Sequence, residues 1–191
     1  MRVLISSFDL DNEDKDPMKR RWKPKFFHNY PGRDSDRDER VVDVALRTSA
    51  APTYFPAYQG YVDGGVVANN PSMAAVAQAL DDRAAGKPLT DLVLLSIGAG
   101  TEPKFIKSRK VDWGWGQWAR PLISMMISGV MGVADFQCRQ LLGERYFRLD
   151  QVFADGVDID DTSEATLDYL TAAAAQVDLR PVERWLQSNR W

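Results

Sequence analysis

The hydrophobic positions along the chain follow two patterns, and these predict strands and helices in turn. Residues 3–8 and 91–97 are nearly continuous apolar runs, which is typical of strands buried on both faces of a sheet. Shorter β-branched and aromatic runs at 25–30, 58–62 and 144–149 predict three further strands. Strands separated by helical stretches predict an α/β fold with a mostly parallel sheet.

Between these strands, apolar residues recur every three or four positions, as one face of a helix requires. The clearest stripe follows Pro71 and consists of Met73, Val76, Ala77 and Leu80. Asn70 is a good N-cap and Pro71 a good first helical residue, so we expect the helix to begin there. Helices are also expected over 41–48, 121–136, 161–177 and, after Asp178, at the C-terminal end.

These elements divide the chain into two parts. We assign residues 1–155 to one α/β domain and residues 156–191 to a helical extension of the same domain. The first strand begins at the second residue, although a buried strand normally needs neighbours and a crossover to reach its place. We therefore expect the domain to be incomplete at its N-terminus.

Composition narrows the classes of function. The 191 residues carry a net charge of −3, which gives no overall field that would draw the chain to nucleic acid or to an anionic membrane. Residues 1–10 lack the basic start and apolar run of a signal peptide, and a cytoplasmic protein is expected. The apolar stretch 121–134 is shorter than the about 20 residues that span a bilayer. We expect no metal and no cofactor.

The chain is organised around Asp63, which follows a short predicted strand and precedes Gly64 and Gly65. This order delivers a carboxylate to the rim of a sheet, where open α/β sheets bind ligands. The two glycines allow a positive φ and the close approach of another backbone. The alternative is an Asp-Gly turn whose carboxylate caps the loop and has no further role.

Three other features admit a functional and a structural interpretation. His28 is the only histidine and stands in an aromatic strand, where packing is the more common role. The segment Gly98–Gly100 resembles a phosphate-binding turn but lacks the third glycine and the Gly-Lys-Ser/Thr sequence. Residues 113–118 are rich in Trp and precede the apolar helix 121–136. That helix is either a half-buried structural element or an adaptable wall for acyl chains, with Trp115, Met125 and Met126 as candidate contacts.

Several segments together resemble the patatin-like phospholipases. The resemblance is carried by residues 50–56 (AAPTYFP), Tyr61–Gly65 and Asn69–Pro71, and it extends to Leu94–Gly100 and Leu141–Asp150. It implies a three-layer α/β/α fold and hydrolysis of lipid acyl esters by a Ser-Asp dyad. In that family the serine lies in a Gly-x-Ser-x-Gly turn, and a Gly-rich loop forms the oxyanion hole.

Only the aspartate half of this machinery has a counterpart here. Asp63, with Gly64 and Gly65, matches the dyad motif, whereas the sequence contains no Gly-x-Ser-x-Gly. The resemblance therefore implies a lipid acyl hydrolase that is inactive alone and needs a complementary N-terminal chain. Its expected partners are a fatty-acyl ester or lipid substrate and the surface of a membrane, with no nucleic acid. The alternative is a non-catalytic remnant that binds lipid or a partner protein.

Overall fold

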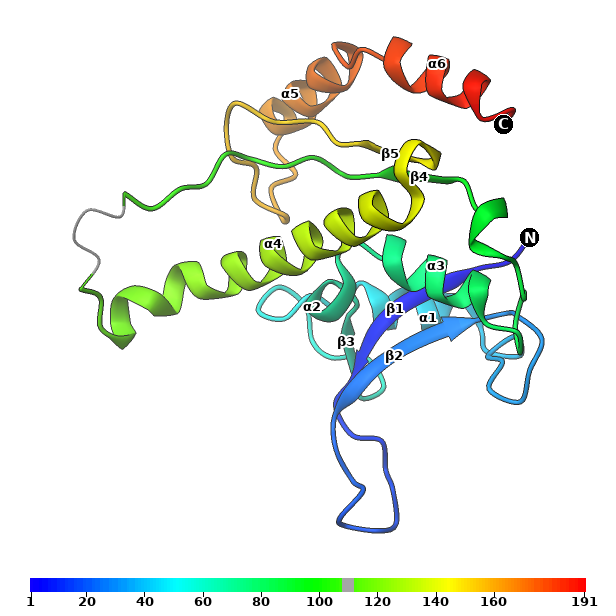
Figure 1. Cartoon of the computed structure of the whole chain (residues 1–191). Helices are drawn as coiled ribbons and strands as arrows, with labels where there is room; N and C mark the ends of the chain where they lie inside the picture. Colours follow the sequence, from blue (N-terminus) through cyan, green and yellow to red (C-terminus); the bar gives the residue numbers. More distant parts are fainter. Residues whose placement is uncertain (108–111) are drawn as a thin grey trace.

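The computed structural model of the chain describes residues 1–107 and 112–191 (Figure 1). The α/β class predicted from the sequence is confirmed. In chain order the elements are β1 (Leu4–Asp9), β2 (Lys23–His28), α1 (Val41–Thr48), β3 (Tyr61–Asp63), α2 (Gly65–Ala68), α3 (Ser72–Leu80), the 3-10 turn η1 (Leu89–Asp91), β4 (Leu94–Ile97), α4 (Trp115–Leu142), the 3-10 turn η3 (Gly143–Arg145), β5 (Tyr146–Leu149), α5 (Glu164–Ala175) and α6 (Arg180–Ser188).

The described strands form two sheets that differ in direction. β4 and β5 are parallel, as predicted, with Leu94 opposite Tyr146. The other sheet has the order β2-β1-β3, and β1 is antiparallel to both of its neighbours. The expectation of a mostly parallel sheet is corrected here to a mixed arrangement. β1 and β2 are joined by a loop without a crossover helix, and such a direct return produces an antiparallel pair.

The strand β1 is less buried than its apolar sequence predicts. Leu4 and Ile5 are half-buried, while Ser7 and Asp9 are the buried residues of the strand. The Ser7 hydroxyl donates to the carbonyl of Val62 at 2.8 Å, which ties β1 to β3 through a side chain as well as through the backbone ladder. The polar residues of β1 therefore lie inside, next to the turn that carries Asp63.

The helix α4 is longer and more exposed than expected. It runs for 28 residues and crosses the molecule between the two sheets in the view of Figure 1. By length and composition alone, Pro121–Arg145 is long and apolar enough to cross a membrane. This corrects the expectation drawn from the 14 uncharged residues 121–134, because the helix continues past Asp135, which pairs with Arg139 one turn later.

The main hydrophobic core joins α4 to α3 and β5. It contains Val76, Cys138, Leu142 and Tyr146, and the partly buried side chains of Met73, Leu80, Leu89, Leu92 and Leu94 pack against it. The predicted stripe of α3 therefore faces the core, except for Ala77, which is exposed. This packing fixes α3, and with it the turn between β3 and α3.

The C-terminal extension packs on β5. Trp185 of α6 lies 5.7 Å from Phe147, ring centroid to ring centroid, and its indole donates to the carbonyl of Glu144 at 2.7 Å. In α5 the N-cap is Ser163, whose Oγ accepts from Thr166 N at 3.3 Å, so the helix expected over 161–177 begins at Glu164. The two helices expected after residue 156 are present as α5 and α6.

Candidate functional site

Asp63 is the last residue of β3, and its backbone is fixed from two sides. It lies opposite Ser7 of β1, and its N–H donates to the carbonyl of Ala50 at 3.0 Å. The N–H of Gly64 donates to the carbonyl of Thr48 at 3.2 Å. The end of α1 and the loop after it therefore hold the strand end in place, as the predicted rim position requires.

Gly64 is required by a close approach of two backbones. A Cβ on this residue would lie 2.3 Å from the carbonyl oxygen and Oγ of Ser6 and 2.6 Å from the Ser6 carbonyl carbon. Gly64 has φ −64°, so the positive φ that the sequence also allowed is not used. The glycine is needed for space and not for its backbone conformation.

The carboxylate of Asp63 is held by one oxygen. Its Oδ1 accepts from the N–H of Gly65 at 2.5 Å, and the side chain forms no ion pair with any residue that the structure describes. Asp63 is half-buried, and its second oxygen accepts no hydrogen bond from a described residue and is not among the buried polar atoms that lack a partner. Next to it, burial raises the pKa of Tyr61, and the charge of Asp9 adds to this, so the phenol stays protonated at neutral pH.

Two asparagines connect the Asp63 turn to α4. Asn70 is buried, and its Oδ1 accepts from Ser72 N at 3.2 Å, which supports the start of α3. The Asn69 side chain donates to Met131 Sδ at 2.8 Å, and Asn70 Nδ2 donates to the Met131 carbonyl at 3.5 Å. The predicted helix start is thus close to correct, with Ser72 as the first helical residue and Asn70 stabilising it by a side-chain hydrogen bond.

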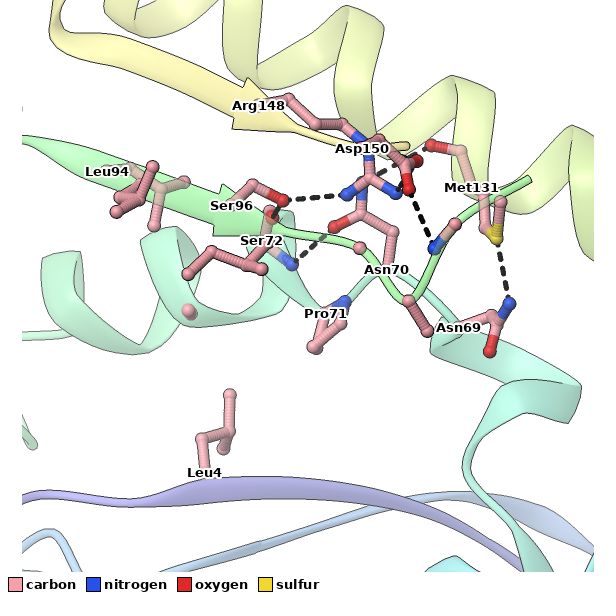
Figure 2. Close-up of a pocket in the computed structure, with 16 residues that line it drawn as sticks. Leu4, Asn69, Asn70, Pro71, Ser72, Leu94, Ser96, Met131, Arg148 and Asp150 are labelled. Carbon is pink, nitrogen blue, oxygen red and sulfur yellow. Dashed lines mark hydrogen bonds and ion pairs between the residues drawn. The ribbon is translucent and has the colours of Figure 1, made fainter. Parts of the chain in front are cut away.

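A polar pocket lies at the carboxyl ends of β4 and β5, and sequence reasoning missed it (Figure 2). It has a volume of about 450 Å³ and extends from Asn69 and Asn70 to Leu4 of β1; Asp63 is not among its lining residues. Ser96 Oγ accepts from Ser72 Oγ at 2.9 Å and from Arg148 Nη1 at 2.8 Å. Arg148 and Asp150 stand 52 and 54 residues after Ser96 in the sequence, and no local pattern joins them.

The same pocket explains the glycines of Gly98–Gly100. A Cβ on Gly98 would overlap the carboxylate of Asp150, and Gly100 has φ +107° and lies against the ring of Phe153. Asp150 accepts from Gly100 N at 3.1 Å and pairs with Arg148 at 2.6 Å. An aspartate therefore occupies the position that the phosphate interpretation would give to an anion, which argues against phosphate binding at this turn.

The three candidate acyl contacts do not share one groove. Met125 lines an apolar groove with Phe105 and Trp113, whereas Met126 lines a different one with Val67 and Met73. Trp115 is 88% exposed at the start of α4. Consecutive helical residues are about 100° apart around the axis, which is why Met125 and Met126 point to different grooves.

His28 is placed away from Asp63. It is opposite Leu4, whereas Asp63 is opposite Ser7, so the two positions are about 10 Å apart along β1. His28 is buried, with Nε2 3.8 Å from Asp34 Oδ2, and its Nδ1 has no hydrogen-bond partner among the described residues. Among those residues, no group of three or more His, Cys, Asp or Glu side chains could hold a metal ion.

The chain is similar to several known proteins. A profile of the patatin-like phospholipase family matches residues 7–76. The sporulation hydrolase CotR of Bacillus subtilis is 32% identical over 98% of this chain, and a cGAMP-activated phospholipase of Vibrio cholerae is 31% identical over 92%. Patatin-like protein 2 of Arabidopsis thaliana is 26% identical over 95%.

The chain spans only part of these relatives. It covers 64% of the length of the Bacillus protein, 54% of the Vibrio protein and 52% of the Arabidopsis protein. The matched family segment contains β3 and the Asp63-Gly64-Gly65 turn, and it ends within α3. From these matches and the α/β fold, the chain resembles the patatin-like phospholipase family, whose profile covers residues 7–76.

Proposed function

We propose that this chain supplies the aspartate of a Ser-Asp dyad in a lipid acyl hydrolase. One observation carries the proposal: Asp63 is rigidly placed at the end of β3, with one carboxylate oxygen held by Gly65 and no cation paired with it among the described residues. One oxygen caps the turn, as the alternative interpretation of an Asp-Gly turn also requires, and the other oxygen is left to accept a proton. The names of the relatives, which include a hydrolase and a phospholipase, support the same reaction class.

The chemistry needs a serine that this sequence does not provide in a Gly-x-Ser-x-Gly turn. In the complete site, the serine hydroxyl attacks the carbonyl carbon of the ester while Asp63 accepts the hydroxyl proton. The alcohol leaves with that proton, and an acyl-serine remains. Water then attacks the acyl-serine while Asp63 accepts a proton of the water. Asp63 passes that proton to the leaving serine oxygen, and the fatty acid is released.

The family implies lipid substrates, and we propose a fatty-acyl ester at a membrane surface as the substrate. Peripheral contact with the membrane from the cytoplasmic side and a complementary segment that carries the serine are parts of this proposal. Backbone donors of the oxyanion hole belong to that segment as well, and each such donor typically contributes about 3 kcal/mol to the transition state. The chain alone is therefore expected to be inactive.

The proposal is tested with two proteins. Residues 1–191 alone should not hydrolyse p-nitrophenyl butyrate faster than a heat-inactivated sample. A chimera that adds the unmatched part of the Bacillus relative, in the order in which that protein has it, should hydrolyse the ester. Asp63→Asn should abolish this turnover, and Asp91→Asn, at an exposed position, should not. Activity of the chain alone that Asp63→Ala removes, or a fully active Asp63→Asn chimera, contradicts the proposal.

A further inference from the structure

The strand β4 is paired on one edge only. It is parallel to β5, and the N–H of Gly98, just beyond the strand, donates to the carbonyl of Leu149 at 2.9 Å. Because successive peptide groups of a strand point to opposite edges, Ser96 also faces β5, whereas Leu95 and Ile97 face away from it. Among the described residues, none accepts a hydrogen bond from the backbone N–H of Leu95 or Ile97. These donors lie on the free edge of the strand.

The strand β1 is also open along part of one edge. The N–H of Asn29 donates to the carbonyl of Val3 at 3.3 Å, so Val3 faces β2 and the peptide groups of Leu4 face the opposite edge. On that edge β3 covers β1 only over Ser7–Asp9. The backbone of Leu4 forms no hydrogen bond there with the part of the chain that the structure describes.

These two open edges line the same polar pocket. Leu4 lines it on one side and Leu94–Ile97 of β4 on the other, as Figure 2 shows. Ser72 and Ala75 of α3 also line the pocket. They are small side chains, which leave room for a further backbone to pass over the helix. The pocket therefore separates two strand edges that each lack a neighbour.

The charges in this pocket already neutralise each other. Arg148 pairs with Asp150 at 2.6 Å, and its Nη1 donates to Ser96 Oγ at 2.8 Å. Both charged side chains are largely buried. A charged ligand would have to break this ion pair, which is costly for buried groups. The groups left to be satisfied are those of the backbone.

From these observations we infer that the polar pocket is the docking site of an extended segment that adds to β4 as a strand and reaches the open edge of β1. Unpaired N–H and C=O groups at alternate residues are satisfied by another extended backbone. The edge Leu94–Ile97 is about 13 Å long, so about four to six residues fill it. The docked strand would join the two sheets into one.

The occupant is the complementary segment of the proposed function, and its identity rests on that proposal. The chain covers 64% of the length of the Bacillus relative, so part of that protein has no counterpart here. Strand addition itself uses none of the chemistry of Asp63 and can be measured separately.

The pocket reaches the Asp63 turn through Asn69, which lines it. The Cβ position that Gly65 lacks is 3.0 Å from Asp63 Oδ1 and 3.1 Å from Asn69 Oδ1, so these two oxygens lie close together. A residue at this end of the docked strand is therefore brought near the carboxylate of Asp63. This placement is what a segment that supplies the serine needs.

Hydrogen exchange followed by NMR tests the inference in the whole chain and in the chimera with the unmatched part of the Bacillus relative. In the chain alone, the amides of Leu95 and Ile97 should exchange rapidly, while that of Ser96, which faces β5, is protected. In the chimera, their rates relative to Ser96 should fall by about a hundredfold or more, because each amide would donate to the docked strand.

A pair of variants at one position tests the same edge by stability. Ile97→Pro removes a free-edge N–H, and proline is tolerated on such an edge. Ile97 is 69% exposed, so the loss of its side chain should have little effect on the chain alone. Ile97→Pro should lower the Tm of the chimera by about 3 °C more than that of the chain. Ile97→Thr keeps the N–H and should change both Tm values alike.

The outcomes separate docking from catalysis. The Asp63→Asn chimera should show the same slow exchange, so protected amides without hydrolysis count against the reaction alone. A folded chimera, active or not, whose Leu95 and Ile97 amides exchange as in the chain alone overturns the inference. Slow exchange of these amides in the chain alone also overturns it, and sedimentation velocity then shows whether a second copy covers the edge. Circular dichroism checks that each protein is folded.

Discussion

Replacing Gly64 with Ala should push the Asp63 turn away from β1. The new Cβ would lie 2.3 Å from two oxygen atoms of Ser6 and 2.6 Å from its carbonyl carbon. The Ser6 hydroxyl can rotate away, but the carbonyl group can move only if β1 moves. β1 is paired with β2 along its whole length and with β3 over Ser7–Asp9, so this movement is resisted on both edges.

The expected size of the effect follows from these contacts. Extra atoms in a packed site typically cost about 1–3 kcal/mol, and a backbone neighbour places this case at the upper end. The movement also disturbs the hydrogen bonds from Gly64 N to Thr48 O and from Thr48 Oγ1 to Ser6 O, at 3.2 and 2.6 Å. We expect a loss of about 3 kcal/mol, which for a chain of this size lowers the Tm by about 6–12 °C.

Urea unfolding followed by circular dichroism, together with a thermal melt, measures this loss. Gly129→Ala is the matched control, because Gly129 lies in the middle of α4 and a Cβ there meets no atom within 4 Å. The control should be stabilised by about 0.5–1 kcal/mol, since alanine favours a helix over glycine. If Gly64→Ala unfolds at the same urea concentration as wild type, the close approach to Ser6 does not exist and the reasoning fails.

Three further predictions concern the core and the polar pocket. Asp150→Ala should cost about 2–3 kcal/mol, because it leaves the largely buried Arg148 without its carboxylate partner; an unchanged Tm contradicts this. Burial alone would raise the pKa of Asp135, but hydrogen bonds from Arg139 and Tyr146 outweigh it and lower that pKa. The stabilisation that this carboxylate gives to the folded state is therefore present above pH about 4 and is lost as the pH falls further. Tyr146→Phe should lower the urea midpoint of unfolding at pH 7, and the decrease in this midpoint between pH 7 and pH 3 should be smaller than in the wild type. If the midpoint depends on pH as it does in the wild type, the hydrogen bond from Tyr146 is refuted. Burial, with a smaller contribution from the charge of Asp135, raises the pKa of the fully buried Cys138 thiol. Ellman's reagent should therefore modify it only in urea, and rapid labelling of the native protein would show that the core is open.

The features that could be predicted from the sequence are those set by neighbouring residues. The start of α3 followed from Asn70 and Pro71, and its buried stripe followed from the spacing of Met73, Val76 and Leu80. The rim position of Asp63 followed from a short strand with two glycines after it. Close approach of a second backbone was also expected of these glycines, and Gly64 against Ser6 confirms it.

The features that could not be predicted depend on residues far apart in the chain. Nothing local to residues 3–8 shows that β1 is antiparallel to both of its neighbours, since pairing direction is set by how the connections return. The pocket of Ser72, Ser96, Arg148 and Asp150 is assembled from three separate segments. The short helix α2 after Gly64 was also missed, because four residues are too few to show a helical period.

The most direct test of the central claim is the rate at which a fluorophosphonate labels the serine of the chimera. This reagent reacts with the serine without any need for turnover, so it isolates the step in which Asp63 accepts the proton. General-base assistance typically contributes a factor of about 10²–10⁴. The account predicts that Asp63→Asn slows labelling by about a hundredfold or more while Asp91→Asn leaves the rate unchanged. Equal labelling rates for Asp63→Asn and wild type would contradict it.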